Sequence, residues 1–163
     1  MCDKPISGGL TGMLHHYYDY NQSTDSSEYP MISSQAMENK AIVLDAFDTL
    51  FNKRDYAAAE CYWSTDYIQH SAHIEPGRDG LFNMVKSSPA SLKYESGIVM
   101  AEDDLVMVHG RFSGFTGAAS WVTANVVRIR DKILVEHWDV LQVEETSERA
   151  TGQSPMYDRS HLA

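Results

Sequence analysis

The chain has 163 residues, of which 43% are hydrophobic, and carries a formal net charge of −10 at pH 7. This length and composition suit one globular domain with a hydrophobic core. The negative charge opposes binding to phosphate backbones and to anionic lipid, so we expect neither nucleic acid nor a membrane as a partner.

The sequence also bears on where the protein is found. It contains no apolar run of about 18 residues, the length that a membrane-spanning helix needs. Residues 1–35 hold no apolar core of the kind that a secretory signal requires. We expect the two cysteines, Cys2 and Cys61, to remain without a structural disulfide. These features favour a cytoplasmic protein.

The first half of the chain predicts an extension followed by helices. Residues 1–35 are rich in turn-forming residues, and we expect an N-terminal extension with little fixed structure. The segment "ENKAIVLDAFDTLFNKRD" then predicts an amphipathic helix. "RDYAAAECYW" predicts a second helix with Asp55 as its N-cap. The apolar stripe of the first helix consists of Ile42, Val43, Ala46, Phe47, Leu50 and Phe51.

The second half predicts strands. "DYIQH" favours a short strand and "GRDGLFNMVKSS" a third helix, and from Leu92 onward apolar residues alternate, with hairpin turns at Asp103–Asp104 and near Asp131. Helices followed by a strand meander indicate an α+β domain over residues 36–145, with a polar C-terminal tail over residues 146–163. N-terminal helices packed on a curved antiparallel sheet would leave a concave face that encloses a cavity.

Alternation along "KILVEHWDVLQ" places an acid and an imidazole on an apolar face. Ile133, Val135, His137, Asp139 and Leu141 are expected to share that face. Buried polar groups of this kind are costly unless they are hydrogen-bonded or functional, and both readings are open.

The turn before this strand decides what lies beside it, because a shift of one residue exchanges the two faces. A two-residue turn would bring Ala124 and Val126 beside His137 and Asp139. We favour a three-residue turn over residues 130–132, although Lys132 is poorly suited to the positive φ that such a turn needs. It groups the polar candidates Trp121, Thr123, Asn125, His137 and Asp139. His109 alternates with Met107 and Arg111 and is expected to point into the same cavity.

The stretch "DYIQHSAHIEPGRDG" carries two further imidazoles. We interpret His70 and His73 as polar walls at the cavity mouth, with Arg78 capping the turn or pairing with Asp79. A zinc or iron site is an alternative, since imidazole and carboxylate are suitable ligands. The spacing lacks the fixed helical geometry of known zinc motifs, so we expect no metal. The candidate ligands would be His70, His73, Glu75, His109 and His137.

Three segments, "YIQHSAHIEPGRDG", "LVMVHGRF" and "VVRIRDKILVEHWDVLQ", resemble the SnoaL-like polyketide cyclase family over residues 38–143. The resemblance is to its branch of SnoaL-like aldol-condensation proteins. It implies an NTF2-like cone-shaped barrel with a deep pocket, usually a homodimer formed through the sheet. It also implies that Asp139 is the acid/base group and that Thr123 and Asn125 contact the substrate. The usual turn glycine of the family is Lys132 here.

An intramolecular aldol closure needs a base, a donor to the enolate and an acid for the new alkoxide. We expect Asp139 to take the proton, while His137 or His109 steadies the oxyanion or returns a proton. Trp121 and Asn125 would orient a flat, polyketide-like substrate without a cofactor. A dehydratase using Tyr67 or Tyr94, an isomerase, an epoxide hydrolase and a non-catalytic dimer that binds a small ligand remain alternatives.

Overall fold

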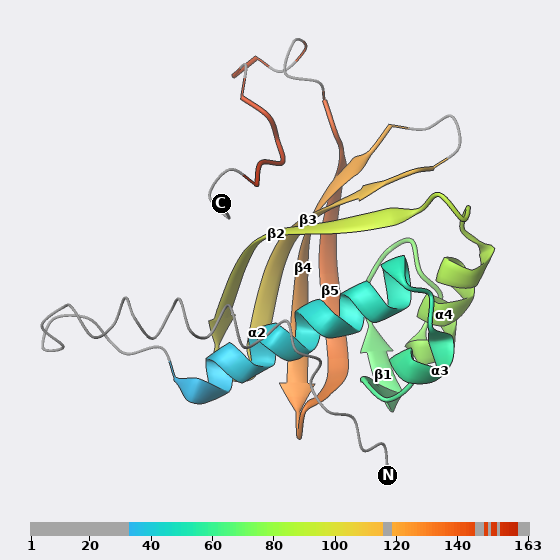
Figure 1. The fold of residues 1–163 in the computed structure, drawn as a ribbon, viewed down its shortest axis with the longest axis vertical. Helices are drawn as coiled ribbons and strands as arrows, with labels where there is room; N and C mark the ends of the chain where they lie inside the picture. The colour runs from blue at the N-terminus through green and yellow to red at the C-terminus, as the bar shows by residue number, and fades with distance from the viewer. Residues whose placement is uncertain (1–32, 116–118, 146–148, 150, 153, 160–163) are drawn as a thin grey trace, which may run out of the picture.

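The computed structural model describes residues 33–115, 119–145, 149, 151–152 and 154–159 (Figure 1). The described residues form the helical elements α2 (Ser34–Phe47), the π-helical turn η1 (Asp48–Asn52), α3 (Tyr56–Ala59) and α4 (Gly77–Ser87). The strands are β1 (Trp63–Gln69), β2 (Lys93–Glu102), β3 (Leu105–Ser113), β4 (Trp121–Arg130) and β5 (Ile133–Val143). They form one sheet in the order β1-β5-β4-β3-β2.

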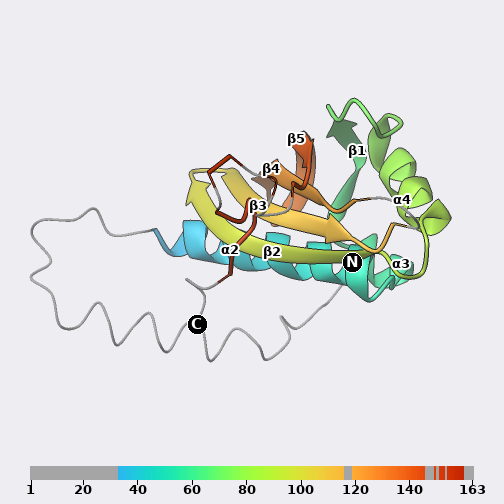
Figure 2. The same cartoon turned by 90° about the horizontal axis from the view of Figure 1, so that it is seen from above.

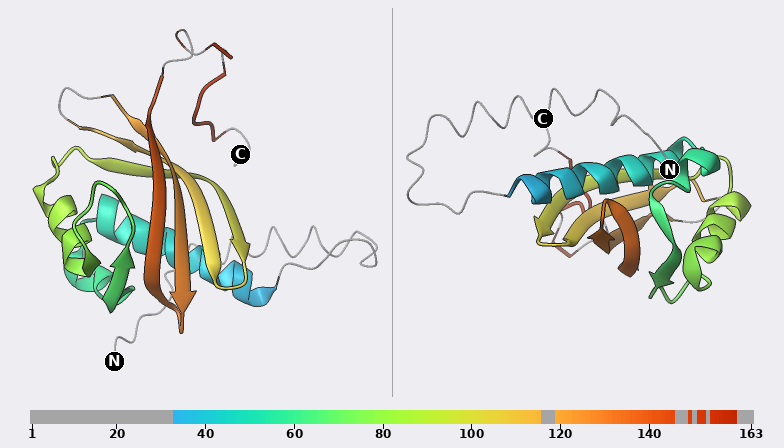
Figure 3. Two further views of the ribbon diagram at one scale, coloured as in Figure 1. Left: turned by 180° about the vertical axis from the view of Figure 1, so that it is seen from behind. Right: turned by 90° about the horizontal axis from the view of Figure 1, so that it is seen from below.

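The sheet is curved, and the helices lie on its concave side. Helix α2 runs across this side, while α3 and α4 gather at the β1 end (Figures 1 and 2). The view from behind shows the other face of the sheet with no helix of the described residues over it (Figure 3). The predicted α+β class is confirmed, but the sheet is mixed, because β1 pairs with β5 in parallel while the other neighbours are antiparallel.

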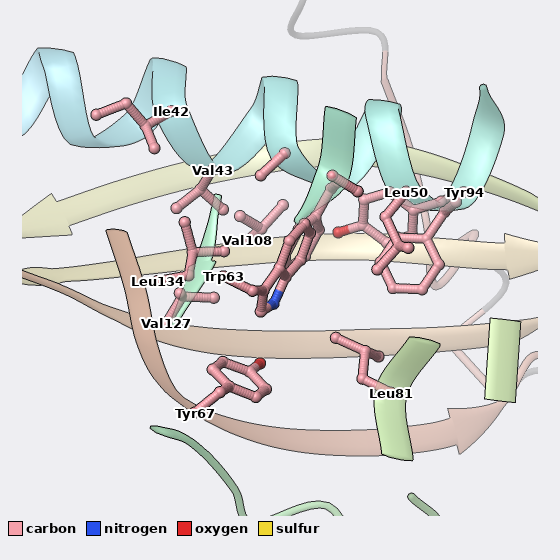
Figure 4. Packing of buried hydrophobic residues seen from close by; sticks show 14 of the residues in the cluster. Ile42, Val43, Leu50, Trp63, Tyr67, Leu81, Tyr94, Val108, Val127 and Leu134 are labelled. Atoms are coloured by element: carbon pink, nitrogen blue, oxygen red, sulfur yellow. The ribbon is translucent and has the colours of Figure 1, made fainter. Parts of the chain in front are cut away.

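The predicted stripe of α2 and η1 forms the core against the sheet. All six of its apolar residues are buried, and Figure 4 shows Ile42, Val43 and Leu50 facing the strands. The helix begins one turn earlier than expected, because the Ser33 hydroxyl accepts a hydrogen bond from the Ala36 amide. Part of the predicted extension, at Ser34, therefore belongs to the helix. Residues 1–32 lie outside the described residues.

The second predicted helix is shorter than expected. It spans Tyr56–Ala59, and the Asp55 side chain caps it by accepting from the Ala58 amide. The strand predicted at "DYIQH" is longer than expected and starts at Trp63. The third helix and the hairpin at Asp103–Asp104 are confirmed.

The predicted three-residue turn between β4 and β5 is wrong. Arg130 pairs with Ile133, so Asp131 and Lys132 alone form the turn, with φ values of 51° and 65°. Two positive φ values fit the twist of a tight hairpin but strain a non-glycine residue, so Lys132 does adopt the conformation to which it is poorly suited.

A β-bulge then corrects the phase of β5. Arg128 pairs with Glu136 while Ile129 pairs with Leu134, which leaves Val135 as an extra residue in its strand. Leu134 is consequently the core residue of this stretch, and the expectation that Ile133 and Val135 share the face of His137 is wrong. Beyond the bulge, Asn125 lies opposite Asp139.

The helices that the described residues form are all too short or too polar to traverse a bilayer. Cys61 is disulfide-bonded, so the expectation that it remains without a disulfide is wrong, and this residue gives no support to a reducing compartment. In the predicted C-terminal tail, the Tyr157 hydroxyl donates to the Ser96 carbonyl over 3.0 Å. The tail therefore contacts the sheet at Tyr157, while residues 146–148, 150, 153 and 160–163 lie outside the described residues.

Candidate active site

A cavity of about 590 Å³ lies between the helices and the concave face of the sheet. Its helical side is apolar, because η1 and α4 are amphipathic and turn their apolar faces inward. Its polar groups come from β1, β4, β5 and the loop after β1. The lining residues are Phe47, Phe51, Tyr67, Ser71, His73, Ile74, Leu81, Met84, Pro89, Leu92, Phe112, Phe115, Trp121, Asn125, His137, Asp139 and Leu141.

Asp139 is the acidic residue among those that line this cavity. It lies on β5, is half-buried, and pairs with Asn125 on the neighbouring strand β4. Its charge acts on two neighbours, since it raises the pKa values of both Tyr67 and His137. The carboxylate therefore stands within electrostatic reach of a phenol and an imidazole in a mostly apolar space.

Tyr67 is the phenol at this end of the cavity. It is buried on the inner face of β1 and lines the cavity with Asp139. Burial raises its pKa well above the usual range for tyrosine, and the charge of Asp139 raises it further. The hydroxyl stays protonated at neutral pH, so it can donate a hydrogen bond to a developing negative charge.

His137 has both ring nitrogens engaged by other side chains. Nδ1 lies 2.8 Å from Gln69 Oε1, and Nε2 lies 3.1 Å from Asn125 Oδ1. Burial lowers its pKa to about 4, although the charge of Asp139 opposes this shift. His137 is thus a neutral wall of the cavity at pH 7, and neither nitrogen is free to exchange a proton with a substrate.

Tyr94 supports this wall from β2. Two hydrogen bonds hold its backbone to the Asn52 side chain. Asn52 Nδ2 donates to the Tyr94 carbonyl oxygen over 3.0 Å, and the Tyr94 backbone N–H donates to Asn52 Oδ1 over 2.9 Å. Its hydroxyl accepts from Asn125 Nδ2 over 3.3 Å. The ring passes over Gly110, where an added Cβ would lie 2.3 Å from the hydroxyl oxygen. A glycine is needed at this point of β3 for Tyr94 to reach Asn125.

Two more of the predicted substrate-binding residues line the cavity. His73 and Trp121 lie near each other, with ring centroids 6.4 Å apart. Thr123 points to the same side of β4 but is only 1% exposed and is not part of the lining. The shorter turn and the bulge together shift the register by two residues, which places Thr123 opposite Leu141 instead of Asp139.

Two predicted histidines lie on the outer face of the sheet instead of in the cavity. On β3, the Val108 side chain points inward, so alternation turns that of His109 outward. There, the ring centroids of His109 and Tyr157 lie 6.0 Å apart. His70 follows an inward-facing Gln69 and also turns outward. It stacks on Trp138 at 4.9 Å and donates to Glu136 over 2.9 Å.

The candidate metal ligands are therefore divided between the two faces of the sheet. His73 and His137 line the cavity, whereas His70 and His109 are on the outer face. Within the part of the chain that the structure describes, no three side chains of His, Cys, Asp or Glu are grouped for metal binding. Arg78 was expected to cap the turn or to pair with Asp79, and its Nε lies 3.8 Å from Asp79 Oδ1.

Sequence reasoning missed Gln69 and Ser71 and gave Tyr67 and Tyr94 only a role in an alternative reaction. The alternation of "DYIQH" carries a signal for two of them, because it puts Tyr67 and Gln69 on one face. No local pattern indicates that Tyr94 reaches across β3 to Asn125.

Comparison with known proteins gives one family and many structural neighbours. The family model described as SnoaL-like domain matches residues 43–137. No curated protein matches the chain. AclR from Streptomyces galilaeus, assigned as a hydroxylase, is 26% identical, with a TM-score of 0.55 over 66% of this chain and 90% of AclR.

Two further structures resemble the fold at lower identity. A protein from Bacillus cereus assigned as a polyketide cyclase is 14% identical, with a TM-score of 0.56 over 73% of this chain and 91% of that protein. An NTF2-like protein from Burkholderia xenovorans is 18% identical, with a TM-score of 0.55 over 68% of this chain and 88% of that protein. With the family match over more than half of the chain, these likenesses show that the protein belongs to the SnoaL-like family and has the NTF2-like α+β fold.

Proposed function

We propose that this protein is an acid/base enzyme that closes a ring in a small, conjugated carbonyl compound by intramolecular aldol-type chemistry. The observation that carries the proposal is a carboxylate, Asp139, in a mostly apolar cavity beside a phenol, Tyr67, that burial keeps protonated. A base beside a neutral hydrogen-bond donor is what enolate formation requires.

In the proposed reaction these two groups act in turn. The Asp139 carboxylate removes a proton alpha to a carbonyl, and the electron pair of the broken C–H bond moves to the carbonyl oxygen. The Tyr67 hydroxyl donates to that oxygen as it becomes negative. The enolate carbon attacks a second carbonyl of the same molecule and forms a C–C bond. The proton held by Asp139 then passes to the new alkoxide, so the product is an isomer of the substrate.

The rest of the cavity suits the substrate that this reaction implies. Aromatic and aliphatic side chains form most of the lining, and Trp121 and Phe112 offer flat surfaces for a conjugated ring system. A second carbonyl next to the reacting carbon would acidify its proton enough that the reaction needs no cofactor. The likeness to the Bacillus cereus protein assigned as a polyketide cyclase supports a polyketide-like compound as substrate.

Conversion of model substrates tests this proposal. Aromatic 1,3-dicarbonyl compounds that carry a further ketone, placed for attack and six-membered ring closure, should give a cyclised product of unchanged mass. The rate should rise in proportion to protein concentration. Matched compounds without the further ketone should bind without forming a ring. Formation only of a product that has gained an oxygen atom, and only with an added oxidant, would contradict aldol chemistry.

We also propose that the protein forms a homodimer through the outer face of the sheet. Ile68 and Val140 are 51% and 73% exposed on the neighbouring strands β1 and β5, and exposed apolar groups of this kind favour association. Sedimentation should show a dimer that Val140→Glu converts to a monomer, while Asn83→Glu on α4 leaves it intact. A monomeric native protein would contradict this assembly.

A further inference from the structure

We propose that Gln69 is a positioning residue, which fixes the proton of His137 on Nδ1 and thereby sets the orientation of the Asn125 amide in the cavity wall. The inference deepens the proposed function, on which its catalytic meaning rests. It concerns a chain of side chains, Gln69–His137–Asn125–Tyr94, that joins strands β1, β5, β4 and β2.

The first link fixes the identity of the atom that faces His137. The backbone N–H of Ser71 donates to Gln69 Oε1 over 3.1 Å, and a backbone N–H has only a donor to offer. The atom that receives it must therefore be the carbonyl oxygen of the amide. The same oxygen lies 2.8 Å from His137 Nδ1. Because an amide oxygen only accepts, Nδ1 must carry a proton.

The second link follows from the charge of the ring. His137 is 5% exposed, and burial holds its pKa near 4, with Asp139 raising it and His70 lowering it. At neutral pH the ring therefore has one N–H, on Nδ1, and a lone pair on Nε2. In the structure, Nε2 lies 3.1 Å from Asn125 Oδ1, a contact that would need a second proton on the ring, and turning the Asn125 amide over exchanges its oxygen and nitrogen. A lone pair needs a donor, so the neutral ring calls for the NH₂ group of Asn125 at this place.

The third link carries this choice to Tyr94. With its NH₂ toward His137, Asn125 presents its oxygen to the Tyr94 hydroxyl, which then donates. With a second proton on His137, the amide keeps the orientation of the structure, in which Oδ1 faces Nε2 and Nδ2 donates to Tyr94 Oη over 3.3 Å. One proton on the ring thus sets the direction of two hydrogen bonds.

This coupling matters at the cavity because Asn125 lines it opposite Asp139. An amide has two N–H groups, and either orientation leaves one of them for a substrate oxygen. The position of that donor depends on which way the amide is turned. Gln69, which does not line the cavity, would therefore determine where Asn125 donates without touching the substrate.

Nitrogen NMR of the protein labelled with ¹⁵N-histidine tests the proposal without any substrate. The chain has seven histidines, and the His137 signals are assigned by their loss in His137→Gln. In the native protein, the neutral ring should carry its proton on Nδ1. Gln69→Leu removes the acceptor, so the proton should move to Nε2, where the Asn125 oxygen can accept it. A native ring protonated on Nε2, or an unchanged tautomer in Gln69→Leu, would overturn the proposal.

A second variant covers the case in which Gln69→Leu does not fold. Gln69→Glu keeps the acceptor and adds a negative charge beside Nδ1, so the pKa of His137 should rise by about 1–3 units. Gln142→Glu, the same change at an exposed position of β5, should leave that pKa unchanged. An unshifted His137 titration in folded Gln69→Glu would overturn the proposal. Since these readouts need no turnover, their failure is distinct from failure of the aldol reaction.

Discussion

Replacing Asp139 by asparagine is expected to lower the turnover of a converted substrate by about 10²- to 10⁴-fold, because general-base catalysis typically contributes this much. Asparagine has nearly the same shape but cannot accept the alpha proton. Among the described side chains, Asp139 accepts no hydrogen bond, and it is half-buried, so the substitution should leave the fold intact. Steady-state kinetics with the native and variant proteins measures the effect.

Asp66→Asn is a suitable control for this experiment. Asp66 is an exposed acid on β1, and the same change of charge there should leave turnover unaltered. A protein that only binds its ligand would give a different result. Its affinity would be similar before and after Asp139→Asn, and neither form would show turnover.

Tyr67→Phe is expected to lower turnover by about 10²- to 10³-fold, the range found when one donor to an oxyanion is removed. The ring of Tyr67 packs in the core, and phenylalanine preserves that packing while it deletes the hydroxyl. The effect should fall mainly on kcat, since the hydrogen bond strengthens as the enolate forms.

Tyr56→Phe is the matched control for this second substitution. Tyr56 lies on α3, outside the cavity lining, with Lys86 Nζ 5.2 Å from its ring centroid. Its hydroxyl should have no influence on turnover. If Tyr67→Phe raises KM and leaves kcat unchanged, Tyr67 contributes only to binding and another group must stabilise the enolate.

The sequence was sufficient to predict the core helix and the hairpins, because these features are local. The spacing of Ile42, Val43, Phe47 and Leu50 follows the helical repeat, and all four residues are buried as that spacing requires. Alternation also placed His137 and Asp139 correctly on the inner face of β5.

The register of the last hairpin could not be predicted in the same way. A three-residue turn and an unbulged strand would have put His137 and Asp139 on the inner face, as the two-residue turn and the bulge at Val135 do in the structure. The two arrangements differ in register by two residues, and this is why Asn125, and not Thr123, lies opposite Asp139. The bulge depends on how β5 bends with the whole sheet, and the sequence of one strand does not contain that information.

The positions of the histidines and the side chains that contact them could not be predicted from the sequence either. Gln69 is 68 residues from His137 in the chain, and only the parallel pairing of β1 with β5 brings them together. His109 was expected in the cavity because it alternates with Met107 and Arg111, and His70 was expected as a polar wall at the cavity mouth. Their strands turn them outward, since an inward neighbour in a strand is followed by an outward residue.

Deuterium exchange at the reacting carbon tests the central claim most directly, because it measures removal of the alpha proton without requiring ring closure. In D₂O, the native protein should catalyse exchange of the alpha proton of a bound 1,3-dicarbonyl compound, followed by proton NMR. Asp139→Asn should reduce that exchange to the uncatalysed rate while binding persists. Exchange that continues at the native rate in folded Asp139→Asn would show that another group is the base and would contradict the mechanism.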